Sequence, residues 1–226
     1  MEEVLPIFTL NIFGFPFDIT LSLVIQWIFI GVTAILSILY SKTVKRIPGK
    51  IQSAIEIIIE KLSGIVSENM GEDKLAFVPY IGALALYIFS LNMIGMFGLK
   101  PPTSELSVTI GLALTTFLVI QGYTIKKLGL KGYFKGYASP IALLLPINIL
   151  ERVMLPVSLS LRLFGNVFAA TMVMELLYEA LGHIHFIATI GIPVPFAFYF
   201  DFFDGIIQTI IFVMLTMIHI KITSEH

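Results

Sequence analysis

Long apolar windows alternate with short polar segments along this chain, and the lengths of the windows predict membrane-spanning helices. Residues 19–41, 76–99 and 106–125 carry no charged side chain. A helix that rises 1.5 Å per residue needs about 20 such residues to cross a bilayer. Two later windows, 140–182 and 184–221, are equally apolar but contain isolated polar residues. The pattern therefore predicts five membrane helices and one membrane domain that spans 1–226.

In one segment between the first two windows, apolar and charged residues alternate with the period of an α-helix. Apolar residues within 51–68 recur at steps of three and four, opposite Glu56, Glu60 and Lys61. This segment is too charged to span a bilayer, so we expect an amphipathic helix that lies along the membrane surface. The predicted fold class is an all-α integral membrane protein of about five transmembrane helices plus this surface helix.

Composition supports a lipid environment and excludes several classes of function. Hydrophobic residues make up 57% of the 226 residues and charged residues 13%, while the formal net charge is −1. Such a balance predicts a membrane as partner and no nucleic acid. The chain has no cysteine, no phosphate-binding glycine loop and no paired histidines on a helix. We therefore expect no metal site, no cofactor and no catalysis by this chain alone.

The basic residues predict the orientation of the chain. In the N-terminal segment 1–18 the only charged side chains are acidic. Clusters of lysine and arginine follow the first and third windows, and they consist of Lys42, Lys45, Arg46, Lys50, Lys126, Lys127, Lys131 and Lys135. Basic loops favour the cytoplasmic side of a membrane. We expect segment 1–18 and the N-terminus outside and the C-terminus in the cytoplasm.

Arg162 is the most unusual residue of the fourth window, because it lies among leucines, valines and phenylalanines. A charged group at that depth is costly and indicates a function. Asn166 lies one turn further along the same helix face and Ser158 one turn before. A guanidinium stays protonated at physiological pH, so Arg162 cannot pass protons on. We expect a fixed positive charge that meets a negatively charged partner.

Acidic residues follow on the last two windows. Glu175 and Glu179 lie one turn apart, and Asp201, Asp204 and Gln208 are spaced as one helical stripe. A carboxyl group in a partly hydrated cavity can load and release a proton or bind a small cation. These residues predict an ion path through the membrane, although Glu179 is equally compatible with solvation at the helix end.

Three stretches resemble a known family. They are PVSLSLRLFGNVFAA at 156–170, QTIIFVMLTMIHI at 208–220 and LNMIGMFGLKPPTSELSVTIGLAL at 91–114. All three are similar to the a subunit of F-type ATP synthases, and the RLFGN motif is similar to bacterial members. The resemblance covers most of the chain from about residue 76 onward, and it implies a bacterial plasma membrane.

The resemblance implies a role for each polar residue. The last two helices would be long and tilted and would lie against a rotating ring of c subunits, each with a membrane-embedded carboxylate. Two half-channels would bring protons, or sodium ions, to the ring from opposite sides, and Arg162 would separate them. Asn166 and Gln208 match polar residues near that arginine, and Asp201 matches a position on the access path. Further partners would be a b-subunit peripheral stalk and a soluble ATPase head.

One position departs from the family pattern. An acid often stands nine residues after the arginine, where this chain has Thr171. Glu175 could replace that acid, Asp201 could suffice with waters, or the Thr171 hydroxyl could suit sodium, which favours oxygen ligands. An alternative hypothesis is a stand-alone secondary transporter or channel in which Arg162 binds an anionic substrate.

Overall fold

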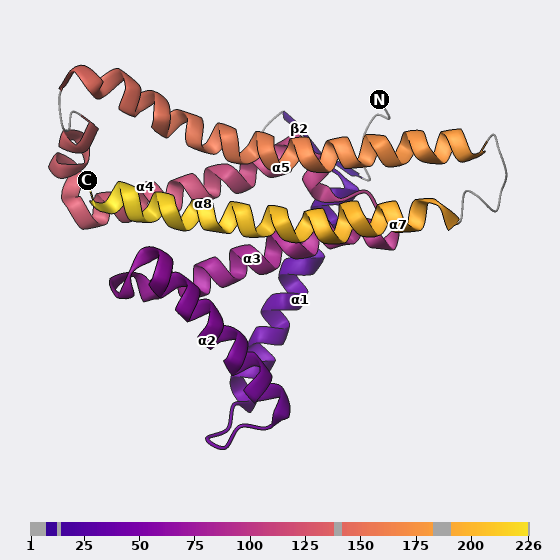
Figure 1. Ribbon diagram of the computed structural model, residues 1–226, viewed down its shortest axis with the longest axis horizontal. Coiled ribbons are helices and arrows are strands. Elements are labelled where there is room, and N and C mark those ends of the chain that lie inside the picture. Colours follow the sequence, from indigo (N-terminus) through magenta and orange to yellow (C-terminus); the bar gives the residue numbers. More distant parts are fainter. Residues whose placement is uncertain (1–7, 13–14, 138–141, 183–190, 226) are drawn as a thin grey trace.

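The computed structural model describes residues 8–12, 15–137, 142–182 and 191–225, and most of them are helical (Figure 1). Within these ranges, five helical stretches are long and apolar enough to cross a membrane, which confirms the predicted fold class. The first four are α1 (Leu21–Thr43), Glu72–Phe97, α4 (Leu106–Tyr137) and α5 (Leu145–Gly182). The second combines η1 (Glu72–Phe77), α3 (Val78–Met93) and η2 (Ile94–Phe97). The fifth, Pro193–Ser224, combines α7 (Pro193–Ala197), η5 (Phe198–Asp204) and most of α8 (Gly205–Glu225).

Several helix bounds differ from those predicted. The helix expected at 106–125 continues past the first lysines to a kink at Gly129, beyond which a second helical piece of α4 runs to Tyr137. The helix expected at 140–182 begins at Leu145, after the short η4 (Ala142–Leu144). The last helix extends past the expected end at 221 to Glu225. Residues 184–190 of that predicted helix, and residues 140 and 141, lie outside the described ranges.

The N-terminal segment contains a feature that the sequence did not predict. Strands β1 (Phe8–Ile12) and β2 (Phe15–Ile19) form an antiparallel pair whose register joins Phe8 to Ile19 and Ile12 to Phe15. Each strand has only five residues. Their short apolar runs precede a much longer apolar window, so hydrophobic periodicity gave no separate strand pattern.

The long helices form the body of the molecule. In Figure 1, α5 and the α7 to α8 stretch run side by side along the longest axis, with α3 and α4 packed against them. Buried apolar side chains from these elements make one core, which includes Ile81, Ile88, Ile120, Leu159, Leu163, Phe212, Met217 and Ile220. Packing of α4 against both long helices, and of α3 against α8, therefore holds the two long helices in place.

The predicted surface helix corresponds to α2 (Lys50–Met70). Val66 and Met70, near its end, are buried in the core, whereas Ile51 and Ile58 remain exposed. In Figure 1, α1 and α2 extend away from the long helices. The apolar residues of the first turns thus face outward, as an amphipathic helix at a membrane surface requires.

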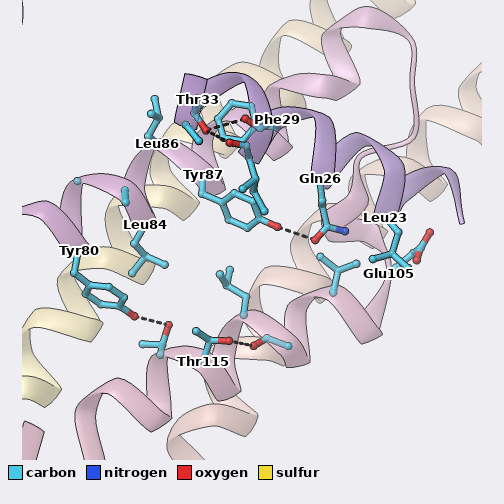
Figure 2. A pocket seen from close by; sticks show the side chains of 18 of the residues that line it. Leu23, Gln26, Phe29, Thr33, Tyr80, Leu84, Leu86, Tyr87, Glu105 and Thr115 are labelled. Carbon is cyan, nitrogen blue, oxygen red and sulfur yellow. Dashed lines mark hydrogen bonds between the residues drawn. The ribbon is translucent and has the colours of Figure 1, made fainter. Parts of the chain in front are cut away.

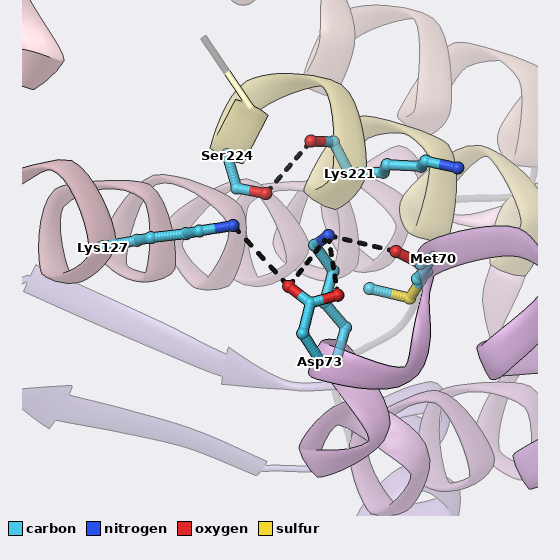
Figure 3. Close-up of polar contacts among 6 residues, drawn as sticks. Met70, Asp73, Lys127, Lys221 and Ser224 are labelled. Atoms are coloured by element: carbon cyan, nitrogen blue, oxygen red, sulfur yellow. Dashed lines mark hydrogen bonds and ion pairs between the residues drawn. The ribbon is translucent and has the colours of Figure 1, made fainter.

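A cluster of charges joins three elements at one end of the bundle (Figure 3). Lys74 is 2% exposed, donates to the Met70 carbonyl at 3.0 Å and pairs with Asp73 at 3.4 Å. Asp73 also lies 3.7 Å from Lys127 of α4, beside Ser224 near the end of α8. The start of the second span therefore lies with the ends of the third and fifth spans, as alternating membrane crossings require.

The opposite end is joined by neutral and acidic groups. The Ser22 hydroxyl donates to Glu105, which links the start of α1 to the start of α4. The Thr103 hydroxyl, in η3 (Pro102–Ser104), donates to Asn92 Oδ1 at 2.8 Å. The connection between the second and third spans is consequently packed onto the helices.

Gly129 divides α4 and permits a testable substitution. Its φ of 70° and ψ of 165° belong to a region that only glycine adopts readily. We expect Gly129→Ala to lower the free energy of unfolding by about 1–3 kcal/mol, measured as a lower thermal midpoint of the purified protein. Gly122→Ala, on the same helix with open space around its Cβ position, is the control. Equal thermal midpoints for the two variants would contradict the conclusion that the backbone at position 129 requires glycine.

Candidate functional site

Arg162 lies on α5 with its charge available. Its guanidinium donates to the Ser158 hydroxyl, one turn earlier, at 3.3 Å. The side chain is partly exposed and forms no ion pair with any carboxylate of the described ranges. Leu161 beside it is 52% exposed. The face around Arg162 therefore presents a fixed positive charge within an apolar surface.

A hydrogen bond joins the two long helices one turn beyond Arg162. Asn166 of α5 donates through Nδ2 to Gln208 Oε1 of α8 at 2.9 Å. Gln208 is 1% exposed, whereas Asn166 is exposed. A buried amide is stabilised only if its polar atoms are paired. The structure thus joins Asn166 and Gln208, two residues that the sequence singled out, one helical turn from Arg162.

The acidic residues meet in a separate cavity of about 270 Å³. Thr171 and Glu175 of α5 line it from one side, and Asp201 and Asp204 of η5 from another. The remaining wall comes from the end of the second span and the loop that follows it, including Asn92, Gly95, Gly98, Leu99, Lys100 and Pro101. The cavity therefore lies at the end of the bundle opposite the Lys74 and Lys127 cluster.

A π-helical turn positions the two aspartates. Residues Phe198–Asp204 adopt π-helical hydrogen bonding within an otherwise α-helical stretch. A π turn bonds residue i to i+5 and so contains more residues than an α turn. Asp201 and Asp204 both line the cavity, while Gln208, one turn beyond Asp204, bonds to Asn166. The π turn changes the angular offset between Asp201 and Gln208 from the uniform α-helical spacing on which the predicted stripe relied.

The comparison with protein families decides between the hypotheses. The sequence model of the family described as ATP synthase A chain matches residues 22–221. This chain belongs to that family. The match confirms the resemblance that the arginine motif and the closing helix indicated.

Curated relatives from several bacteria are similar in sequence over most or all of this chain. The sodium-ion-specific ATP synthase subunit a of Propionigenium modestum is 31% identical over 93% of this chain and 75% of its own length. ATP synthase subunit a of Moorella thermoacetica is 33% identical over 91% of each chain. The Staphylococcus carnosus subunit a is 31% identical over both full lengths. The similarity therefore covers all five spans.

The cavity bears on the departure at Thr171. The Thr171 hydroxyl donates to the Val167 carbonyl at 2.9 Å, so its hydrogen is used within α5. Glu175, one turn further, lines the same cavity as Thr171 and both aspartates. A carboxylate therefore lines the same cavity one helical turn from the Thr171 position.

Asn92 and Lys100 are two cavity residues that the sequence interpretation missed. Asn92 is 3% exposed, and its Nδ2 has no hydrogen-bond partner within the described ranges. A buried donor of this kind is costly unless water or another polar group reaches it. A lone amide within the charge-free window 76–99 was the available indication. Lys100 adds a positive charge where the loop between the second and third spans borders the cavity.

The absence of a side chain at Gly95 leaves room for the carboxylate of Asp201. A Cβ built at Gly95 would lie 2.6 Å from Cγ of Asp201, closer than real Cβ contacts. We expect Gly95→Ala to displace the Asp201 carboxylate and to slow ion transport several-fold in assembled complexes reconstituted in vesicles. Gly111→Ala, whose Cβ would meet open space, is the control. Equal transport by both variants would show that the Asp201 position is unimportant.

A larger cavity of about 1090 Å³ lies between α1, α3 and α4, away from these residues (Figure 2). Its polar side chains bond to one another: Tyr87 donates to Gln26 at 2.7 Å, and Tyr80 to Thr116 at 3.3 Å. None of the residues predicted for the ion path lines it. The smaller cavity is the better candidate because three carboxylates line it, whereas the larger cavity has only Glu105 among its lining residues, and that carboxylate accepts a hydrogen bond from Ser22.

Proposed function

We propose that this chain is the ion-translocating a subunit in the membrane sector of an F-type ATP synthase. The observation that carries the proposal is the geometry of α5, where Arg162 has no carboxylate partner among the residues that the structure describes and lies one turn from the Asn166 to Gln208 bond. Such a charge suits a carboxylate that passes on a c-subunit ring. ATP is made elsewhere in the complex, so the chain is not an enzyme on its own.

The acidic cavity is the half-channel that opens to the outside. Its carboxylates and the Thr171 oxygen offer sites between which a small cation can move toward Gln208 and Asn166. Arg162 blocks direct passage to the second half-channel, because a fixed positive charge repels a cation. An ion must therefore board the ring and cross with it, which couples ion flow to rotation.

The partners and location follow from this role. They are a c-subunit ring with membrane-embedded carboxylates, a b-subunit peripheral stalk and, through the complex, a soluble ATPase head. The end with Lys74 and Lys127 faces the cytoplasm of a bacterium, and the N-terminal segment 1–18 lies outside its plasma membrane. The clustering of basic side chains at one end supports this orientation.

Copurification tests the assignment. An affinity tag on this chain in its native membrane should recover a ring of small helical hairpins and a soluble ATPase in constant ratio. Recovery of the chain alone under conditions that preserve other membrane complexes would contradict the assignment.

The translocated ion is a proton in this proposal, and sodium is the second candidate because a relative is described as sodium ion specific. We expect ATP hydrolysis by the assembled complex to be unchanged when sodium is added at constant pH and ionic strength. The potassium salt at the same concentration is the control. Stimulation by sodium alone would assign the path to sodium.

A further inference from the structure

A group of side chains outside the ion path holds the first turns of α5. This group, which we call the Arg152 clamp, consists of Gln121, Tyr133, Tyr137, Asn148 and Arg152. The Arg152 guanidinium carbon lies 4.2 Å from the ring centroid of Tyr137 and 5.2 Å from that of Tyr133. Its Nη1 donates to Gln121 Oε1 at 3.1 Å. Arg152 belongs to α5, whereas all three of these partners belong to α4.

Hydrogen bonds connect the members of the clamp. The Tyr133 hydroxyl donates to Gln121 Oε1 at 2.9 Å and lies 2.7 Å from the Tyr137 hydroxyl. Because Tyr133 has one hydroxyl hydrogen, Tyr137 donates to Tyr133. Asn148 Nδ2 donates to the Tyr137 carbonyl at 2.8 Å. The body of α4, its last turns and the start of α5 are thus joined in one network.

The kink at Gly129 makes the clamp possible. Gln121 precedes the kink, and both tyrosines follow it. The unusual backbone angles of Gly129 redirect the chain so that the tyrosine rings return to Arg152. The two rings and the amide then hold a planar guanidinium, which can stack and donate hydrogen bonds at once, whereas an ammonium group cannot.

Pro156 makes an external support necessary. It lies within α5, four residues after Arg152. Proline lacks the N–H that would bond to the carbonyl of residue 152, so the helix is weakened at this turn. Arg162 lies beyond that turn, about 15 Å from Arg152 along the helix.

We propose that the Arg152 clamp sets the direction of α5 and thereby holds Arg162 at the distance from the ring that coupled transport needs. Arg152 is a positioning residue in this scheme, which rests on the function proposed above. Its guanidinium makes no contact with the ion. Loss of the clamp changes the angle at Pro156 and moves Arg162 away from its partner.

Spin-label distances in the complete complex test this inference. The chain has no cysteine, so labels can be attached to single cysteines at Leu118 of α4 and Leu176 of α5, both well exposed. We expect Arg152→Met to shift or broaden the distance distribution and to lower the ions transported per ATP hydrolysed several-fold, with the complex still assembled. Tyr137→Phe keeps the ring and should have a smaller effect. Glu151→Gln, an exposed neighbour, is the control and should change neither.

Several outcomes would contradict the proposed role of the Arg152 clamp in positioning α5. An unchanged distance distribution in Arg152→Met would overturn it, as would a shifted distribution with full transport. If Arg152→Met does not assemble, a Tyr133→Phe and Tyr137→Phe double variant keeps both rings without the hydroxyl bonds, and unchanged distances and transport there would overturn the inference. The distances report helix position even in a complex that transports no ions, so failure of the clamp is distinguishable from failure of the proposed function.

Discussion

Replacing Arg162 by lysine is expected to abolish ATP-driven ion transport while the complex still assembles. Lysine keeps the charge, but a compact ammonium cannot reproduce the planar guanidinium that reaches Ser158. Two opposite charges 4 Å apart attract by about 4 kcal/mol at an effective dielectric constant near 20. Loss of much of that attraction corresponds to a decrease of at least about 100-fold. Ion uptake by vesicles that contain the purified complex and ATP measures it.

Ser158→Ala is the matched control for this experiment. It removes the hydrogen bond to Arg162 but retains the guanidinium, so we expect only a modest decrease in transport. Substantial coupled transport by Arg162→Lys would contradict the separator role. If Arg162→Gln disturbed assembly but left the assembled complexes fully active, the arginine would be a structural contact.

Replacing Asp201 by asparagine is expected to slow ion transport by roughly 10-fold to 100-fold without preventing assembly. Asparagine has nearly the same shape, so the packing against Gly95 is retained. Its amide cannot accept and release a proton, and positioned proton-transfer groups contribute factors of about 10² or more. The rate of proton uptake per assembled complex, measured with a pH-sensitive dye, checks this prediction.

Glu179→Gln serves as the control for Asp201. Glu179 is exposed and lies one turn beyond Glu175, outside the residues that line the acidic cavity. Its replacement should leave transport unchanged. Normal turnover in Asp201→Asn would remove that residue from the path, whereas equal losses in both variants would indicate a general effect of surface charge.

The lengths of the apolar windows predicted the five spans, because such long apolar segments have few alternatives to membrane helices. Arg162 was identifiable since a charge at that depth is rare, and Asn166 followed from helical spacing. Those inferences depend on one residue type or one helix. The Asn166 to Gln208 bond joins two residues that the resemblance named together.

Contacts between distant segments could not be predicted in the same way. No sequence pattern indicated the π turn at Phe198–Asp204, which carries Asp201 and Asp204. The fit of Asp201 over Gly95 depends on two helices that are far apart in sequence. The partners of Arg152 could not be predicted either, because both tyrosines follow a kink at Gly129 that a regular helical period does not show.

The most direct test of the central claim compares ion flux through two sets of vesicles. One set contains this chain alone, and the other contains it assembled with its ring, stalk and ATPase head. We predict ATP-driven ion uptake only in the assembled set, and its loss when Arg162→Lys replaces the native chain. Saturable transport of an anionic substrate by the chain alone would contradict the account.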